Sequence, residues 1–171
     1  MNYFLENICT MDWNEQQDAG RTWEDATQVL APHFPKYKSE IQAYSQRWEE
    51  MLMGPIDGTV KILKNLKLKK EYQIVALTNW SRETFPIAQE RYDFLQLFEG
   101  ILISGIEMMK KPDPRIYNLL LERYNIQADR AVFIDDSLRN VKAAQAVGIH
   151  AIHFQSPQQL QEALKAYNIE I

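Results

Sequence analysis

Two adjacent aspartates, Asp135 and Asp136, directly follow the apolar residues 131–134. Such a run predicts a buried strand, so both carboxylates stand where that strand ends. Like charges that lose hydration side by side destabilise a fold unless a cation, a helix N-terminus or hydrogen bonds compensate them. Carboxylate oxygens suit a hard cation such as Mg2+, so the pair predicts a magnesium site.

Two other expected strands end in residues that suit a phosphate group. Thr78 and Asn79 offer a hydroxyl, an amide and backbone N–H groups, and Ser81 is placed to cap the next helix. Lys111 follows the second strand, just before a helix that Asp113 can cap. Capping alone would explain the Thr-Asn and Asp-Pro pairs, but it does not explain the lysine. Lysine and the Thr and Asn donors suit phosphate oxygens, so the set is more specific than any of its members.

The elements that position these residues alternate between helix and strand from Gly58 onward. Apolar runs predict strands at 72–78, 100–104, 131–134 and 150–154, and helical patterns cover 58–68, 82–92, 114–124, 138–147 and 157–167. Strands without a polar face indicate a Rossmann-like parallel sheet with helices on both faces, an α/β fold. Ligands of such folds bind at the carboxyl ends of the strands, where the polar residues stand.

Residues 1–53 show only helical patterns and predict a small α-helical domain, followed by an α/β domain over 54–171. Thr22 and Asp25 resemble a capping box, and the helix that covers most of residues 36–53 ends before Gly54 and Pro55.

The composition excludes several classes of protein. The chain has 171 residues, 46% of them hydrophobic and 25% charged, and its net charge of -4 argues against a nucleic-acid partner. No apolar stretch approaches the roughly 20 residues of a membrane span. The acidic N-terminus does not resemble a signal peptide, so we expect a cytoplasmic protein. We expect it to be a monomer or a homodimer. Cys9 is the one cysteine, and a packing role is predicted for it. His150 and His153 are predicted to have structural roles.

Three motifs resemble, in their residues and in their order, those of the haloacid dehalogenase superfamily of hydrolases. The resemblance is to the subfamily that has a helical cap. "IVALTN" is similar to the second motif of that family, "KKPDPRIY" to the third and "VFIDDSLRNVKAA" to the fourth. The resemblance implies that Thr78 and Asn79 hold a transferring phosphoryl group. It also implies that Lys111 stabilises this group and the nucleophile, and that Asp135 and Asp136 help to hold Mg2+. Residues 1–53 would be the cap that covers the site and selects substrates.

The acidic pair also separates two chemistries within the superfamily. True haloacid dehalogenases work without a metal and resemble this chain elsewhere, but they have neutral residues where Asp135 and Asp136 stand. Two carboxylates would repel a halocarboxylate substrate and the departing halide. We therefore expect a Mg2+-dependent phosphatase of small phosphorylated metabolites, with a 2-haloacid dehalogenase as the alternative.

The first motif of the family, a strand that ends in Asp-x-Asp and supplies the nucleophile of an aspartyl-phosphate, has no counterpart here. "PIDGTV" imitates its tail, but Pro55 stands at the position of the nucleophile and a helix precedes it, so Asp57 is predicted to be a surface residue. The resemblance places the first strand between those ending at Thr78 and Ile134. We therefore expect an incomplete and inactive form of a longer protein, with a non-catalytic phosphate- and metal-binding module as the rival hypothesis.

Four tryptophans complete the set of notable residues. Trp13, Trp23 and Trp48 occur at helical spacing and are expected in the core of the cap rather than in a substrate cage. Trp80 follows Asn79 and can either pack under the cap or line the pocket.

Overall fold

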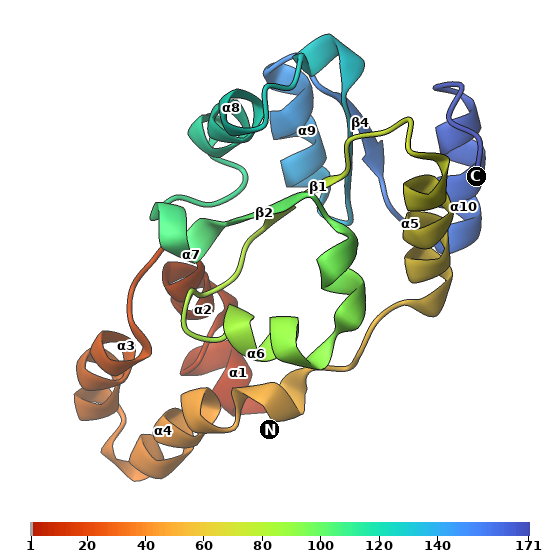
Figure 1. The fold of residues 1–171 in the computed structure, drawn as a ribbon. Coiled ribbons are helices and arrows are strands. Elements are labelled where there is room, and N and C mark those ends of the chain that lie inside the picture. Colours follow the sequence, from red (N-terminus) through yellow and green to blue (C-terminus); the bar gives the residue numbers. More distant parts are fainter. Residues whose placement is uncertain (1) are drawn as a thin grey trace. The chain divides into compact units, whose positions relative to one another are not determined.

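The computed structural model describes residues 2–171, which divide into two compact units (Figure 1). The first unit comprises the chain up to Met53 together with Thr78–Arg91 and Ile103–Lys110. The second comprises Gly54–Leu77, Tyr92–Leu102 and Lys111–Ile171. The chain first passes from one unit to the other after Met53. Two segments expected in the α/β domain nevertheless pack in the same unit as the N-terminal helices.

The first unit is helical. Its α-helices are α1 (Asn2–Asn7), α2 (Met11–Asp18), α3 (Trp23–Leu30), α4 (Lys38–Gln46), α6 (Phe85–Arg91) and α7 (Ser104–Glu107). Short 3-10 turns lie at η1 (Ala31–His33), η2 (Pro35–Tyr37) and η3 (Trp48–Met51). The predicted cap at Thr22 is confirmed, because its hydroxyl accepts a hydrogen bond from Asp25 N at 3.1 Å. The buried side chains of Ile8, Cys9, Ala31 and Ile41 form one core cluster.

The helix expected between residues 36 and 53 is shorter than predicted. Helix α4 ends at Gln46, and Arg47 leaves helical geometry before η3 begins. The Trp48 ring then lies 5.3 Å from the Trp80 ring, centroid to centroid. Burial of these two large rings against each other outweighs the preference for one continuous helix.

The second unit alternates helices and strands, as predicted. Its elements are α5 (Asp57–Lys69), β1 (Val75–Thr78), η4 (Asp93–Leu97), β2 (Gly100–Ile103), α8 (Pro114–Arg123), η5 (Ala128–Arg130), β3 (Val132–Asp135), α9 (Leu138–Ala146), β4 (His150–His153) and α10 (Pro157–Lys165). The last residues of β1 and β2 belong to the first unit. Helices α5 and α10 lie side by side (Figure 1) and bury Ile62, Leu160 and Leu164 against Ile152.

All four predicted strands are present, and the α/β class is confirmed. They form two separate two-stranded sheets, β1 with β2 and β3 with β4. Strands β3 and β4 are parallel, with Val132 opposite His150 and Asp135 opposite His153. The strand ends that carry Thr78 and Asp135 are thus where the apolar runs predict them.

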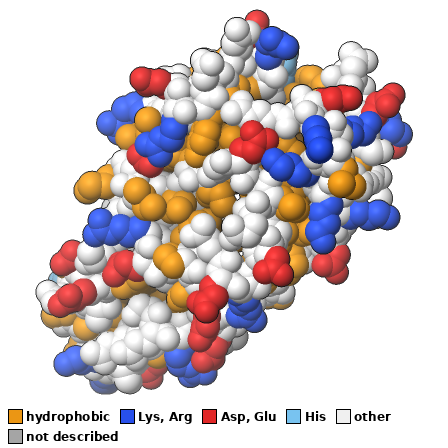
Figure 2. Space-filling view, in the orientation of Figure 1, with side chains coloured by type: hydrophobic (Ala, Val, Ile, Leu, Met, Phe, Trp, Pro, Cys, Tyr) orange, Lys and Arg blue, Asp and Glu red, His pale blue; other side chains and the backbone are white. Residues whose placement is uncertain are grey.

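Charged side chains of both signs are interspersed over the face that Figure 2 shows, which agrees with the small net charge. Among residues 2–171, no helix combines the length and the apolar composition that crossing a bilayer requires.

Candidate functional site

The ammonium of Lys111 and the carboxylate of Asp135 form an ion pair within the second unit. Lys111 Nζ lies 2.7 Å from Asp135 Oδ2, and the two side chains are only 10% and 6% exposed. Lys111 Nζ also donates to the backbone carbonyl of Leu77 at 2.9 Å. Lys111 and Asp135, which are 24 residues apart in the sequence, are therefore in contact. The neighbouring lysine has another role, because Lys110 pairs with Glu15 in the first unit.

The second oxygen of Asp135 is held by the beginning of α9. Asp135 Oδ1 accepts hydrogen bonds from the backbone N–H of Ser137 and from Asn140 Nδ2, each at 2.9 Å. A carboxylate at a helix N-terminus is stabilised by the exposed N–H groups and the helix dipole. Asn140 was not predicted to be a site residue. Its position beside Val141, on the face of α9 that the structure buries, is the feature of the sequence that could have identified it.

Tyr117 supports this arrangement from α8. Its hydroxyl donates to the backbone carbonyl of Asn140 at 2.9 Å, and its ring meets the Phe133 ring edge-on at 5.5 Å. Burial raises the pKa of the Tyr117 hydroxyl above its ordinary value, and the nearby charge of Asp135 adds to the effect. Lys111 Nζ lies 5.5 Å from the centre of the Phe133 ring, so a cation–π contact adds to its ion pair.

Asp136 differs from Asp135 in its surroundings. Its side chain is exposed, while its backbone carbonyl accepts a hydrogen bond from His153 Nε2 at 2.9 Å. Because a carbonyl cannot donate, the imidazole must carry a proton on Nε2. This contact agrees with the structural role predicted for His153.

The acidic pair satisfies part of what Mg2+ requires. Asp135 Oδ2 receives one described hydrogen bond, and the Asp136 carboxylate faces solvent, so each offers an oxygen. Within residues 2–171, no three His, Cys, Asp or Glu side chains cluster closely enough to hold a metal alone. Mg2+ commonly binds one or two carboxylates and completes its shell with water and substrate phosphate, so the two aspartates fit that mode.

Thr78 and Asn79 lie at the end of β1 and belong to the first unit. Both residues are partly buried, and Ser81 accepts a hydrogen bond from Glu83 N at 3.2 Å in the turn that leads to α6. Lys111 touches the carbonyl of Leu77, the residue directly before Thr78. Thr78 belongs to the first unit, whereas Lys111 and the acidic pair belong to the second, and a shared site of these groups stays a prediction.

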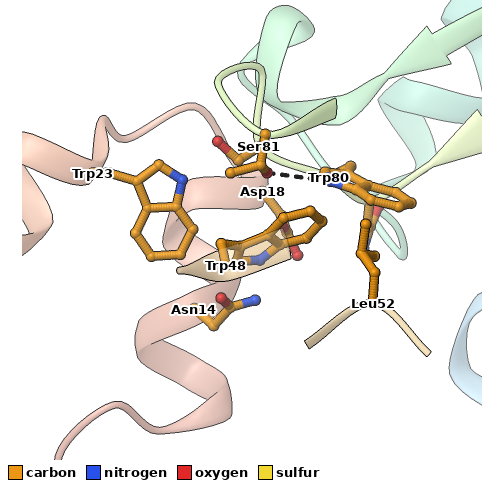
Figure 3. Close-up of a pocket in the computed structure, with 9 residues that line it drawn as sticks. Asn14, Asp18, Trp23, Trp48, Leu52, Trp80 and Ser81 are labelled. Atoms are coloured by element: carbon orange, nitrogen blue, oxygen red, sulfur yellow. Dashed lines mark hydrogen bonds between the residues drawn. The ribbon is translucent and has the colours of Figure 1, made fainter. Parts of the chain in front are cut away.

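Asn79 also borders a cavity of about 200 Å3 that lies wholly within the first unit (Figure 3). The rings of Trp23, Trp48 and Trp80 form much of its wall, and the remaining lining residues are Asn14, Asp18, Leu52, Ser81 and Thr84. The Trp80 indole is fixed because its Nε1–H donates to Thr84 Oγ1 at 3.2 Å. We call this cavity the aromatic pocket.

The indole nitrogen of Trp23 has no hydrogen-bond partner although the residue is only 7% exposed. A buried polar group without a partner is destabilising, and this one belongs to a residue that lines the aromatic pocket. The expectation that Trp13, Trp23 and Trp48 serve only as packing is therefore incomplete. Trp13 packs against Tyr44 at 5.5 Å, whereas Trp23 and Trp48 also line the aromatic pocket.

Asp57 and Cys9, for which the sequence predicts no catalytic role, take no part in these sites. Asp57 is the exposed first residue of α5. Cys9 is buried in the helical core, and burial raises the pKa of its thiol to about 12, so the unreactive thiol form dominates at neutral pH.

Comparison with known sequences points to one family. The profile of haloacid dehalogenase-like hydrolases matches residues 10–154. A sesquiterpene phosphatase from Aspergillus oryzae is 38% identical over 150 residues, which cover 87% of this chain and 76% of that protein. A phosphorylated carbohydrates phosphatase from Thermotoga maritima is 28% identical over 117 residues, covering 68% of this chain but only 54% of the relative.

Solved structures give the same result. A haloacid dehalogenase family enzyme from Bacteroides thetaiotaomicron, in complex with magnesium and inorganic phosphate, matches with a TM-score of 0.70 and 25% identity over 89% of this chain and 79% of that one. A hydrolase of the same fold from Porphyromonas gingivalis matches with a TM-score of 0.75 over 98% of this chain and 84% of the other. At 14% identity this second match shows the fold alone.

Proposed function

Because the chain belongs to the haloacid dehalogenase-like hydrolases, we propose that it serves the Mg2+-dependent hydrolysis of phosphate monoesters. The observation that carries this proposal is the buried contact of Lys111 with Asp135, next to the exposed carboxylate of Asp136. One ammonium and two carboxylates suit a site that takes both a phosphate and a divalent cation. The same acids would repel a halocarboxylate and a leaving halide, which disfavours metal-free dehalogenation.

Each residue has a defined task in this proposal. Lys111 is held by two oxygen acceptors before any ligand arrives, so its charge is already in place to attract a phosphate oxygen. Asp135 Oδ2 and the Asp136 carboxylate are the oxygens that we assign to Mg2+, which would neutralise phosphate charge when bound. Thr78 and Asn79 are assigned to donate hydrogen bonds to the phosphate. No residue of this chain is assigned as the nucleophile.

The aromatic pocket narrows the class of substrate. Rings of Trp23, Trp48 and Trp80 favour an apolar group, and the Trp23 indole N–H can donate to an oxygen on it. The relatives act on substrates of different kinds, since one is a sesquiterpene phosphatase and another a phosphorylated carbohydrates phosphatase. The pocket supports the phosphate ester of an apolar alcohol that carries one hydrogen-bond acceptor.

Calorimetric titration of the 171-residue protein with Mg2+ in the presence of inorganic phosphate tests the metal and phosphate site. We expect saturable binding that Asp136→Asn weakens at least about tenfold, because one charged oxygen ligand is lost. Asp57→Asn is the matched control, since it removes an exposed acid elsewhere and should leave the affinity unchanged.

Three results separate the alternatives. Equal affinities for the Asp136→Asn and unmodified proteins would contradict the metal assignment. Chloride release from 2-chloropropionate without metal would favour the dehalogenase. Hydrolysis of 4-nitrophenyl phosphate by the 171-residue protein would contradict both the expected inactivity of this chain and the non-catalytic binding module.

A further inference from the structure

The segment that follows β2 holds the loop that follows β1. The two strands pair in one sheet, and they end at Ile103 and Thr78. Residues 79–84, which we call the site loop, then lead from β1 to α6. The site loop and the segment after β2 both belong to the first unit. Four residues of the site loop line the aromatic pocket, namely Asn79, Trp80, Ser81 and Thr84.

Ser104, the first residue after β2, binds both backbone polar groups of Trp80. Its Oγ accepts a hydrogen bond from Trp80 N at 2.9 Å and donates to Trp80 O at 3.4 Å. The backbone N–H of Gly105 donates to the same carbonyl at 3.1 Å. Ser104 is completely buried, and a buried hydroxyl is destabilising without partners. The hydroxyl and the polar backbone groups of Trp80 therefore satisfy one another just beyond the ends of the paired strands.

Gly105 allows the two segments to approach this closely. A side chain at this position would place its Cβ 2.6 Å from Arg82 N and 2.7 Å from Trp80 O. Both distances are well below van der Waals contact, and both atoms belong to the backbone of the site loop. Any residue other than glycine would therefore displace the loop. The Ser-Gly pair after β2 thus determines where the site loop lies.

The side chain of Trp80 is held as firmly as its backbone. Its ring meets the Phe85 ring edge-on at 5.4 Å, and Phe85 is only 2% exposed. Its Nε1–H donates to Thr84 Oγ1 within the site loop (Figure 3). Because Asn79 directly precedes Trp80, the same contacts restrict the backbone of Asn79. A group that is ordered before its ligand arrives binds that ligand more tightly, since no further ordering is needed.

We propose that Ser104 is a positioning residue for the binding of the phosphate ester. Ser104 does not touch the ligand in this proposal. It holds the backbone of Trp80, and through it the amide of Asn79 and the indole ring in the wall of the aromatic pocket. The inference rests on the proposed function, in which Asn79 donates to the phosphate and Trp80 contacts the apolar group.

The first measurement needs no ligand and compares Ser104→Ala with the unmodified protein. Hydrogen exchange followed by NMR should be at least about tenfold faster at the Trp80 amide, because its acceptor is lost. The Ala26 amide, which donates to Thr22 O in the same unit, is the internal reference and should change much less. Ile41→Val is the control variant, since it removes a methyl group from the buried helical core of this unit and should not speed exchange at Trp80 selectively.

The second measurement is calorimetric titration with phenyl phosphate in the presence of Mg2+, under conditions in which circular dichroism shows every variant to be folded. Ser104→Ala should bind about fivefold more weakly, and Ile41→Val should bind as the unmodified protein does. Ser104→Cys keeps the volume of the side chain but has a weaker donor and acceptor, so its affinity should fall between those of serine and alanine. This variant also carries the test if Ser104→Ala does not fold.

The outcomes separate a positioning role from a purely structural one. Faster exchange at Trp80 with unchanged affinity for phenyl phosphate would overturn the proposal, because Ser104 would then stabilise the fold alone. Full affinity of Ser104→Cys beside a weakened Ser104→Ala would assign the effect to packing volume and would also overturn it. If the unmodified protein does not bind phenyl phosphate, the proposed function fails, whereas unchanged exchange at Trp80 in Ser104→Ala would refute the role of Ser104 by itself.

Discussion

Replacing Lys111 with methionine should destabilise the protein more than the loss of any surface ion pair. The substitution keeps the length of the side chain but leaves Asp135 buried with Ser137 N and Asn140 as its described donors, and it removes the contact with Leu77 O. Breaking a buried ion pair by removing one partner costs about 3–5 kcal/mol. Since Asp135 keeps two donors, we expect the low end, about 3 kcal/mol.

The assay is urea unfolding followed by circular dichroism, with the stability taken by linear extrapolation. With a slope of about 2 kcal/mol per molar, a loss of about 3 kcal/mol lowers the midpoint by about 1.5 M. Lys165→Met is the matched control, because Lys165 lies 2.8 Å from Glu162 with side chains 65% and 73% exposed. That change should cost no more than about 0.5 kcal/mol.

A double-mutant cycle with Asp135→Asn isolates the coupling between the two groups. The two changes should be strongly non-additive, because asparagine in place of the buried charge no longer needs the ammonium. If Lys111→Met costs as little as Lys165→Met, the ion pair does not hold the two strand ends, and the assignment of Lys111 to a preformed charged site is wrong.

Two further predictions concern the first unit. Trp23→Phe keeps the ring and removes the unpartnered indole N–H, so calorimetry should show two- to tenfold weaker binding of 4-acetylphenyl phosphate and unchanged binding of phenyl phosphate, which lacks the carbonyl acceptor. Trp13→Phe, which removes a similarly unpartnered N–H outside the aromatic pocket, should change neither, and an equal effect of both variants would contradict the pocket assignment. Because burial raises the pKa of Cys9 to about 12, its stabilising contribution is complete below the unfolded thiol pKa of about 8.5 and is lost as pH rises toward 12. Unfolding free energies of Cys9→Ala and the unmodified protein between pH 8 and 10.5 should therefore show a shallower alkaline decline in the variant, and parallel declines would contradict this origin.

Some features of the site could be predicted because they depend on local sequence and on one general rule. The apolar run before Asp135 marks the end of β3, and Lys111, which was expected beside the acidic pair, forms an ion pair with Asp135. The cap at Thr22 follows from the residue type and from Asp25 three positions later. The strand end and the helix cap can be predicted from residues that are close together in the sequence.

Other features depend on contacts between distant residues and gave weaker signals. The hydrogen bond from Asn140 to Asp135 needs the actual direction of α9, which a helical pattern does not supply. That Trp23 borders a cavity rather than solid packing depends on Trp48 and Trp80 from other segments. The separation of β1 from β3 likewise depends on which strands pair, and strand pairing depends on residues that are far apart in the sequence.

The geometry of the acidic pair changes the explanation that the sequence suggests for it. Two adjacent aspartates were expected to require a cation between them, but only one of them is buried: Asp135 is the last residue of β3, and Asp136, in the bend that follows, is exposed. Only Asp135 loses its water, and Lys111, Ser137 N and Asn140 compensate its charge. The fold therefore stabilises the pair with its own donors. A cation at these carboxylates, as we propose, would stabilise the protein only through its binding affinity.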